Sequence, residues 1–180
     1  MLTFLAILLT LIYPLTIWLA EGRIEPRVLA VVLLLVGFAR LVSVQMIQAT
    51  RWWLGATMLL VLLAVWGNAM FPLKLYPVIV NATLLGVFAY SLIIPPSAIE
   101  RIARMREPQL PAPAIGYTRR VTQVWCVFFF VNGAIALCTA LYASSALWSL
   151  YNGFVAYIFM GLLLAGEYCV RRRVMGQQRG

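Results

Sequence analysis

The longest stretch of low hydrophobicity in this chain is residues 95–125, PPSAIERIARMREPQLPAPAIGYTRRVTQVW. It carries two of the five acidic residues and five of the fourteen Lys and Arg residues, which are Arg101, Arg104, Arg106, Arg119 and Arg120. Everything around it is strongly apolar. The stretch therefore predicts a polar connection between hydrophobic segments, and it divides the chain into a part before it and a part after it.

Composition places those hydrophobic segments in a membrane. Of 180 residues, 64% are hydrophobic and only 11% are charged, whereas soluble domains are close to one quarter charged. Apolar runs of about 20 residues are typical of transmembrane helices. The sequence predicts six of them, at 2–20, 28–46, 53–70, 75–95, 118–143 and 147–170, with a polar loop at 96–117. The predicted fold is an all-α, polytopic membrane bundle that forms a single membrane domain over 1–180.

Charge distribution predicts the orientation of this bundle. With both termini inside, the inner segments contain eleven Lys and Arg residues and the outer turns contain three, which are Arg23, Arg27 and Lys74. The positive-inside rule then places both termini and the 96–117 loop in the cytoplasm. This bias accounts for the net charge of +9 without a nucleic acid partner.

The loop itself contains a helix signal. Pro95 and Pro96 end the preceding helix, and Ser97 with Glu100 matches a capping box. A short amphipathic helix to about Arg106 should follow and lie at the membrane surface, with Glu100 and Arg104 paired at i,i+4. Pro108, Pro111 and Pro113 predict an extended segment after it.

Polar residues inside apolar segments are the candidate site residues, because burying them in a membrane is costly. Asn132, Asn152 and Glu167 are the intramembrane polar candidates, and Glu167 is the only weak candidate for a catalytic acid. The candidates for binding an anion or a lipid headgroup are Arg40, Arg101, Arg104, Arg119, Arg120 and Gln123. Two interpretations stay open: a structural ion pair with snorkelling arginines, or a polar pocket open to the cytoplasm.

Several chemistries are not indicated. The chain has no His and no Asp, which removes His-based acid–base catalysis and most zinc sites. Its three Cys lie in apolar segments without CxxC spacing. No cofactor and no metal are expected, and whether the protein is an enzyme stays open.

Six short motifs carry a resemblance to a known family. They are PPSAIERIAR (95–104), LPAP (110–113), YTRRVTQVW (117–125), FFFVNG (128–133), LYNG (150–153) and GEY (166–168). Together they resemble an uncharacterised bacterial inner-membrane protein family encoded beside genes for aryl-polyene or xanthomonadin-type pigment synthesis. The resemblance implies the bacterial cytoplasmic membrane and a fatty-acid-synthase-like pathway, but it assigns no residue a role.

Three functional hypotheses follow. The first is a membrane accessory protein whose basic face recruits an acidic acyl carrier protein or a ketosynthase partner, or holds an anionic membrane lipid. The second is a small transporter of a lipid or polyene, and the third is an integral-membrane enzyme acting on an acyl or prenyl substrate. The oligomeric state is left open.

Overall fold

The computed structural model describes residues 71–105 and 107–176, together with scattered single residues between 28 and 67. Its side-chain detail extends to Arg172. The predicted span 2–20 lies outside the described residues, as do Arg40 and Arg106, and only isolated positions of the spans 28–46 and 53–70 are described. The structural account therefore concerns the chain from Phe71 onward.

This part of the chain is helical throughout, with no strand among its described residues. The elements are α4 (Phe71–Lys74), α5 (Tyr76–Ile93), α6 (Ala98–Arg104), α7 (Ala112–Tyr142), α8 (Ser145–Leu150), the π-helical segment η1 (Tyr151–Val155) and α9 (Ala156–Gly176). Three helical stretches within it are long and apolar enough to cross a membrane: Phe71–Ile93, Ala112–Tyr142 and Ser145–Arg172. They correspond to the predicted fourth, fifth and sixth spans, and they indicate a membrane protein.

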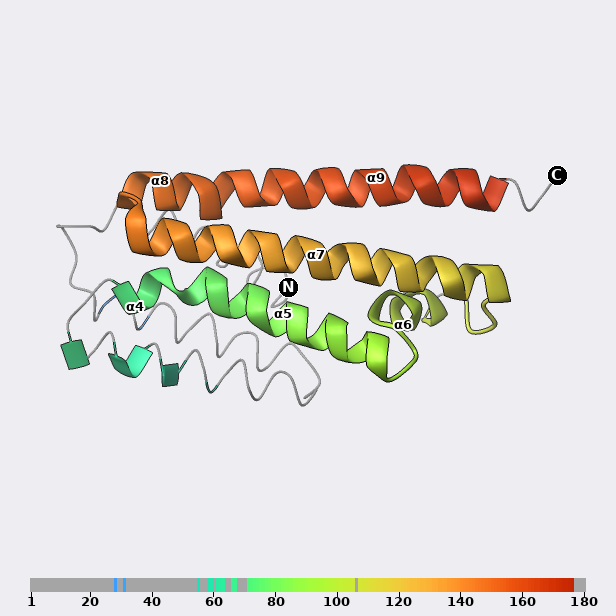
Figure 1. The fold of residues 1–180 in the computed structure, drawn as a ribbon, viewed down its shortest axis with the longest axis horizontal. Helices are drawn as coiled ribbons and strands as arrows, with labels where there is room; N and C mark the ends of the chain where they lie inside the picture. The colour runs from blue at the N-terminus through green and yellow to red at the C-terminus, as the bar shows by residue number, and fades with distance from the viewer. Residues whose placement is uncertain are drawn as a thin grey trace.

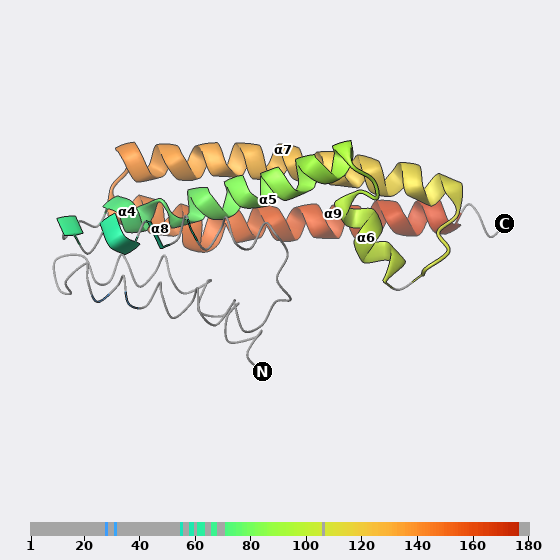
Figure 2. The same ribbon diagram turned by 90° about the horizontal axis from the view of Figure 1, so that it is seen from below.

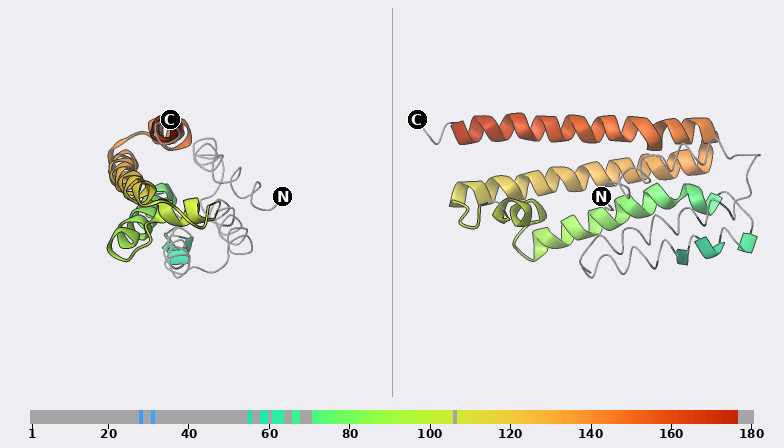
Figure 3. Two further views of the ribbon diagram at one scale, coloured as in Figure 1. Left: turned by 90° about the vertical axis from the view of Figure 1, so that its right-hand side faces the viewer. Right: turned by 180° about the vertical axis from the view of Figure 1, so that it is seen from behind.

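The middle helix α7 runs antiparallel to both α5 and α9, which run in the same direction as each other (Figure 1). Seen along the bundle, α7 lies between α5 and α9 (Figure 3). α6 runs across the bundle, beside the first turns of α7 (Figure 2). The bundle therefore has two distinct ends. One carries α6, the start of α7 and the end of α9, and we call it the α6 end. The other carries α4 and α8, and we call it the α4 end.

The described helices differ from the predicted boundaries in three places. α9 continues to Gly176, six residues beyond the predicted end of the last span at 170. The predicted turn at 71–74 is a single helical turn, α4. α7 begins at Ala112, six residues before the predicted start of the span at 118. Pro113 does not extend the chain as predicted, because it lies in the first turn of α7, where the N–H that proline lacks has no intrahelical partner in any case.

An aromatic cluster holds α5, α6 and α7 together. Val121, Trp125 and Phe129 form its buried centre on α7, and Phe88 of α5 meets the Phe129 ring edge-on at 5.1 Å between centroids. Ile99 of α6 packs on the same cluster. Burying such rings is worth about 1.5–3 kcal/mol each when they leave water. In lipid that driving force is weaker, so the fit of the rings matters more.

Close approach of α5 and α7 depends on one glycine. A Cβ added at Gly133 would lie 3.1 Å from the Cβ of Asn81. Two further small residues of α7, Ala136 and Ala140, are also buried. The small pair Gly161 and Ala165 on α9 is exposed, and a Cβ at Gly161 would meet nothing within 4 Å.

Candidate functional site

α6 is fixed to the bundle by its first backbone N–H groups. The N–H of Ala98 donates to Ser91 Oγ of α5 at 2.8 Å, and the N–H of Ile99 donates to Thr122 Oγ1 of α7 at 3.3 Å. The N–H of Ser97 donates to Glu100 Oε2 at 3.3 Å, which confirms the predicted capping arrangement. Side chains thus bind the N–H groups that a helix start leaves unpaired. Three N–H groups at the start of the helix are therefore used by the protein itself.

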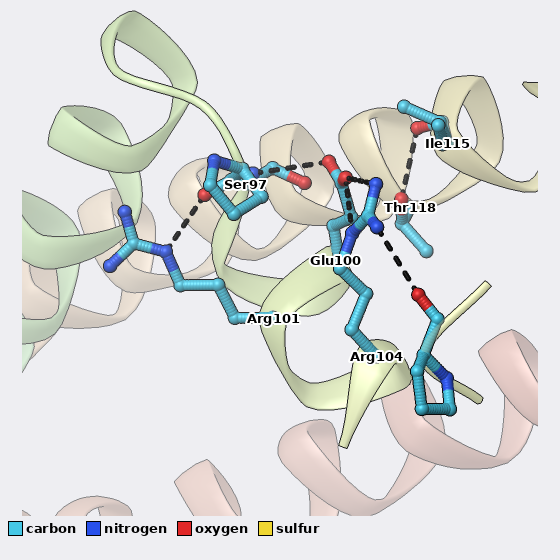
Figure 4. A network of polar contacts seen from close by, with 8 residues as sticks. Ser97, Glu100, Arg101, Arg104, Ile115 and Thr118 are labelled. Atoms are coloured by element: carbon cyan, nitrogen blue, oxygen red, sulfur yellow. Dashed lines mark hydrogen bonds and ion pairs between the residues drawn. The ribbon is translucent and has the colours of Figure 1, made fainter. Parts of the chain in front are cut away.

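Two arginines of α6 bind groups of residues that are close to them in sequence (Figure 4). Arg104 forms the predicted pair with Glu100, with its Nη2 at 2.7 Å from Oε1, and its Nη1 donates to the carbonyl of Pro108 at 3.4 Å. Arg101 donates through Nε to the carbonyl of Pro96 at 2.9 Å. Glu100 is only 5% exposed, so the pair with Arg104 neutralises a buried carboxylate. Anion binding by Arg101 and Arg104 would compete with these contacts.

The next two arginines are placed differently. Arg119 and Arg120 lie on the exposed side of α7, and so does Gln123, one turn further along from Arg119. The buried side of the same turns carries Thr118 and Thr122, whose hydroxyls donate to backbone carbonyls of α7 at 2.9 and 2.8 Å. Within the described part of the chain, no ion pair engages Arg119 or Arg120. Of the predicted anion-binding arginines that the structure describes, these two have guanidinium groups available to a partner.

Glu167 lies at the same end of the bundle. The hydroxyl of Tyr117 on α7 donates to the backbone carbonyl of Glu167 on α9 at 3.2 Å, so these two positions are level with each other. Arg171 is near enough to act electrostatically on the same hydroxyl, and Arg172 lies over the ring of Tyr168 at 5.6 Å. The half-buried carboxylate of Glu167 makes no salt bridge with any arginine that the structure describes. Arg40, another predicted candidate, lies outside the described residues.

A chain of buried polar groups crosses the three long helices between the two ends. The Tyr151 hydroxyl donates to Asn132 Oδ1 at 2.8 Å, Asn132 Nδ2 donates to Asn81 Oδ1 at 3.0 Å, and Asn81 Nδ2 donates to the carbonyl of Pro77 at 2.8 Å. Each donor has an acceptor, which is what apolar surroundings require of a polar side chain. This chain satisfies Asn132 internally and links η1, α7 and α5.

Asn152 has a similar internal role nearer the α4 end. Its Nδ2 donates to Thr139 Oγ1 on α7 at 3.2 Å and to the carbonyl of Trp148 at 2.9 Å. Trp148 is fully buried, and its Nε1 donates to the carbonyl of Lys74 at 3.1 Å. These contacts tie α8 to α7 and α4.

The structure thus separates the predicted site residues into three places. Arg101 and Arg104 hold the α6 segment, Asn132 and Asn152 hold helices together, and Arg119, Arg120 and Gln123 face outward. The partners of the two asparagines were absent from the prediction. Asn81 was predictable from the sequence, because it is another amide side chain inside an apolar run. No sequence feature marked Tyr151 as a hydrogen-bond partner.

Charge is concentrated at the α6 end. Of the cationic side chains that the structure describes, one lies at the α4 end and six lie at the α6 end, which are Arg101, Arg104, Arg119, Arg120, Arg171 and Arg172. The three described acids, Glu100, Glu107 and Glu167, are also there, and they leave an excess of positive charge. Among the described residues, no group of His, Cys and acidic side chains could hold a metal ion.

Comparison with known proteins does not assign this chain to a family. No protein-family model, no curated protein and no solved structure matches the chain. The class of protein that the fold supports is a helical membrane protein with one basic end.

Proposed function

We propose that this chain is an accessory protein of the bacterial cytoplasmic membrane. In this proposal it crosses the membrane six times, with the α6 end and both termini in the cytoplasm. Its basic end recruits an acidic acyl carrier protein, or a ketosynthase carrying one, to the membrane in an aryl-polyene or lipid-like pathway. The pathway rests on the motif resemblance, and the orientation rests on the positive-inside rule.

The observation that carries the proposal is the exposed pair Arg119–Arg120. Two adjacent guanidinium groups, with no ion pair to any acid among the described residues, present ten N–H donors in planar forks, which match carboxylates and phosphates. An acyl carrier protein offers both, as acidic side chains and as a phosphopantetheine group. The remaining cations at the α6 end raise the local positive potential, which attracts an acidic partner.

Binding of a carrier protein to the full-length chain tests the proposal. The chain would be reconstituted in nanodiscs of zwitterionic lipid, and the binding of a purified bacterial acyl carrier protein would be measured by biolayer interferometry. The double variant Arg119→Gln/Arg120→Gln should raise Kd about tenfold, which corresponds to the loss of roughly 1.4 kcal/mol for two charge contacts at the rim of an interface.

The matched control is Arg119→Lys/Arg120→Lys, which keeps both charges and removes the planar forks. It should bind more tightly than the Gln variant and less tightly than the unmodified protein. The proposal fails if the carrier protein does not bind, or if the Gln variant binds it with unchanged Kd. A Gln variant that keeps carrier binding but loses co-purified anionic lipid would replace it with the lipid-holding role.

A further inference from the structure

The position of α6 along the bundle is well defined. Its second residue, Ile99, is hydrogen-bonded to Thr122, and its first, Ala98, is bonded to Ser91 near the end of α5. α6 is therefore level with the turn of α7 that also carries Arg119 and Arg120. It lies across the long helices instead of continuing one of them (Figures 1 and 2).

The exposed surface at the end of this helix includes two large apolar side chains beside Arg101. Ile102 is 56% exposed, and Met105, the residue directly after the helix, is 85% exposed. These two share one face at i,i+3 spacing. Arg104, in contrast, turns back to Glu100 and to the Pro108 carbonyl. The last turn of α5, at the same end of the bundle, also exposes a large apolar side chain, since Ile93 is 78% exposed.

The length of α7 places this level at a membrane boundary. α7 has 31 residues and is about 46 Å long at 1.5 Å per residue, whereas the hydrocarbon core of a bilayer is roughly 30 Å thick. Residues 121–142 alone span about 33 Å. The part of α7 that exceeds the thickness of the hydrocarbon core therefore lies at its Ala112 end. The hydrocarbon core then begins near the turn that holds Arg119 and Arg120. Arginines at such a boundary extend their charge to the lipid headgroups.

We propose that α6 is a membrane-inserted interfacial helix, with Ile102 and Met105 embedded among the acyl chains of the leaflet at the α6 end. The occupant of this apolar face is the lipid that also surrounds the exposed end of α5. The side-chain bonds to the first N–H groups of α6 let the helix sit in this partly dehydrated layer. The proposal holds whichever side of the membrane the α6 end faces, and it does not depend on the carrier-protein hypothesis.

Cysteine accessibility in nanodiscs tests the placement, because both faces of a nanodisc are open to reagents. Cys126, Cys138 and Cys169 would first be replaced by Ala. A single cysteine would then be introduced as Met105→Cys or, as the matched control, as Gln109→Cys, an exposed position four residues further on. The maleimide reaction at position 105 should be about tenfold slower than at 109, because insertion of an apolar side chain favours the lipid by at least that factor. In SDS both cysteines should react at the same rate.

Nitroxide labels at the same positions identify what covers the face. A label at position 105 should collide frequently with oxygen, which concentrates in lipid, and rarely with a water-soluble nickel chelate. The label at 109 should show the opposite preference. If Met105→Cys does not assemble, Ile102→Cys probes the same face.

Two results would overturn the inference. Equal maleimide rates at 105 and 109 in nanodiscs would mean that the face is in water. Protection from both oxygen and the nickel chelate would mean that protein, either a second copy or another chain, covers it instead of lipid.

Discussion

The buried chain Tyr151–Asn132–Asn81 gives the most quantitative prediction. Tyr151→Phe removes only the hydroxyl that donates to Asn132 Oδ1 at 2.8 Å, and leaves the Asn132–Asn81 bond of 3.0 Å in place. Asn132→Ala removes both bonds. The two changes act on one shared contact between η1 and α7, so their effects on the free energy of unfolding should not add.

The expected loss of stability for each substitution depends on the hydrogen bonds it removes and the buried polar groups it leaves unpaired. Hydrogen bonds between transmembrane helices contribute about 0.6 kcal/mol on average and at most about 1.7 kcal/mol. Tyr151→Phe should therefore cost about 1 kcal/mol, since it also leaves the buried Asn132 carbonyl oxygen without this donor. Asn132→Ala should cost about 2 kcal/mol, because it also removes the donor to the Asn81 oxygen. The coupling energy between the two changes should be about 0.6 kcal/mol.

Reversible unfolding in mixed SDS and non-ionic detergent micelles, followed by circular dichroism, measures these differences for the two single variants and the double variant. Tyr142→Phe is the matched control, because the Tyr142 side chain is 86% exposed. It should change stability by less than about 0.5 kcal/mol. The reasoning is refuted if the effects of Tyr151→Phe and Asn132→Ala add with no coupling, or if Tyr142→Phe destabilises as much as Tyr151→Phe.

Two further predictions concern how the helices fit together. Gly133→Ala should destabilise by about 1–3 kcal/mol, because its new methyl group would lie 3.1 Å from the Cβ of Asn81. Gly161→Ala, with nothing within 4 Å, should be neutral or stabilising by up to about 1 kcal/mol; equal effects of the two substitutions in the same unfolding assay would contradict the packing. Thr122→Val should speed hydrogen exchange at the Ile99 amide about tenfold, while Thr122→Ser should leave it near the original rate; unchanged exchange in the Val variant would show that this hydroxyl does not hold α6.

The sequence was most informative where the signal is local. Pro95 and Pro96 cannot continue a helix, and the capping residues Ser97 and Glu100 mark the start of the next helix at Ala98. The boundary between α5 and α6 therefore follows from residue type alone. The predicted pair of Glu100 and Arg104 also depends only on their spacing along one helix, and the structure confirms this pair. The start of α7 lies earlier than predicted, because Pro113 indicates an extended segment by residue type although proline is well tolerated in a first helical turn.

Residue type could not show which arginines bind groups of the protein itself. Arg101 and Arg119 are both cations in one polar stretch, yet Arg101 binds the carbonyl of Pro96 while Arg119 faces outward. The difference comes from the path of residues 94–97, which places that carbonyl 2.9 Å from the Arg101 guanidinium. A chain path of this kind is set by contacts between elements, which no single segment encodes.

The helical, membrane-spanning character of this protein was determined by its sequence alone, because apolar length and one-sided charge are properties of segments and need no partner. The choice of partners for the buried polar groups was decided only by the tertiary structure. Tyr151 and Asn152 are adjacent in sequence. Tyr151 donates to Asn132 and Asn152 donates to Thr139, and these two acceptors lie seven positions apart on α7. A regular α-helix turns successive side chains about 100° apart, and the wider π-helical turn of η1 reduces that angle, so both residues can reach α7. That turn is stabilised by the contacts it makes across the bundle, and these exist only once the helices have packed.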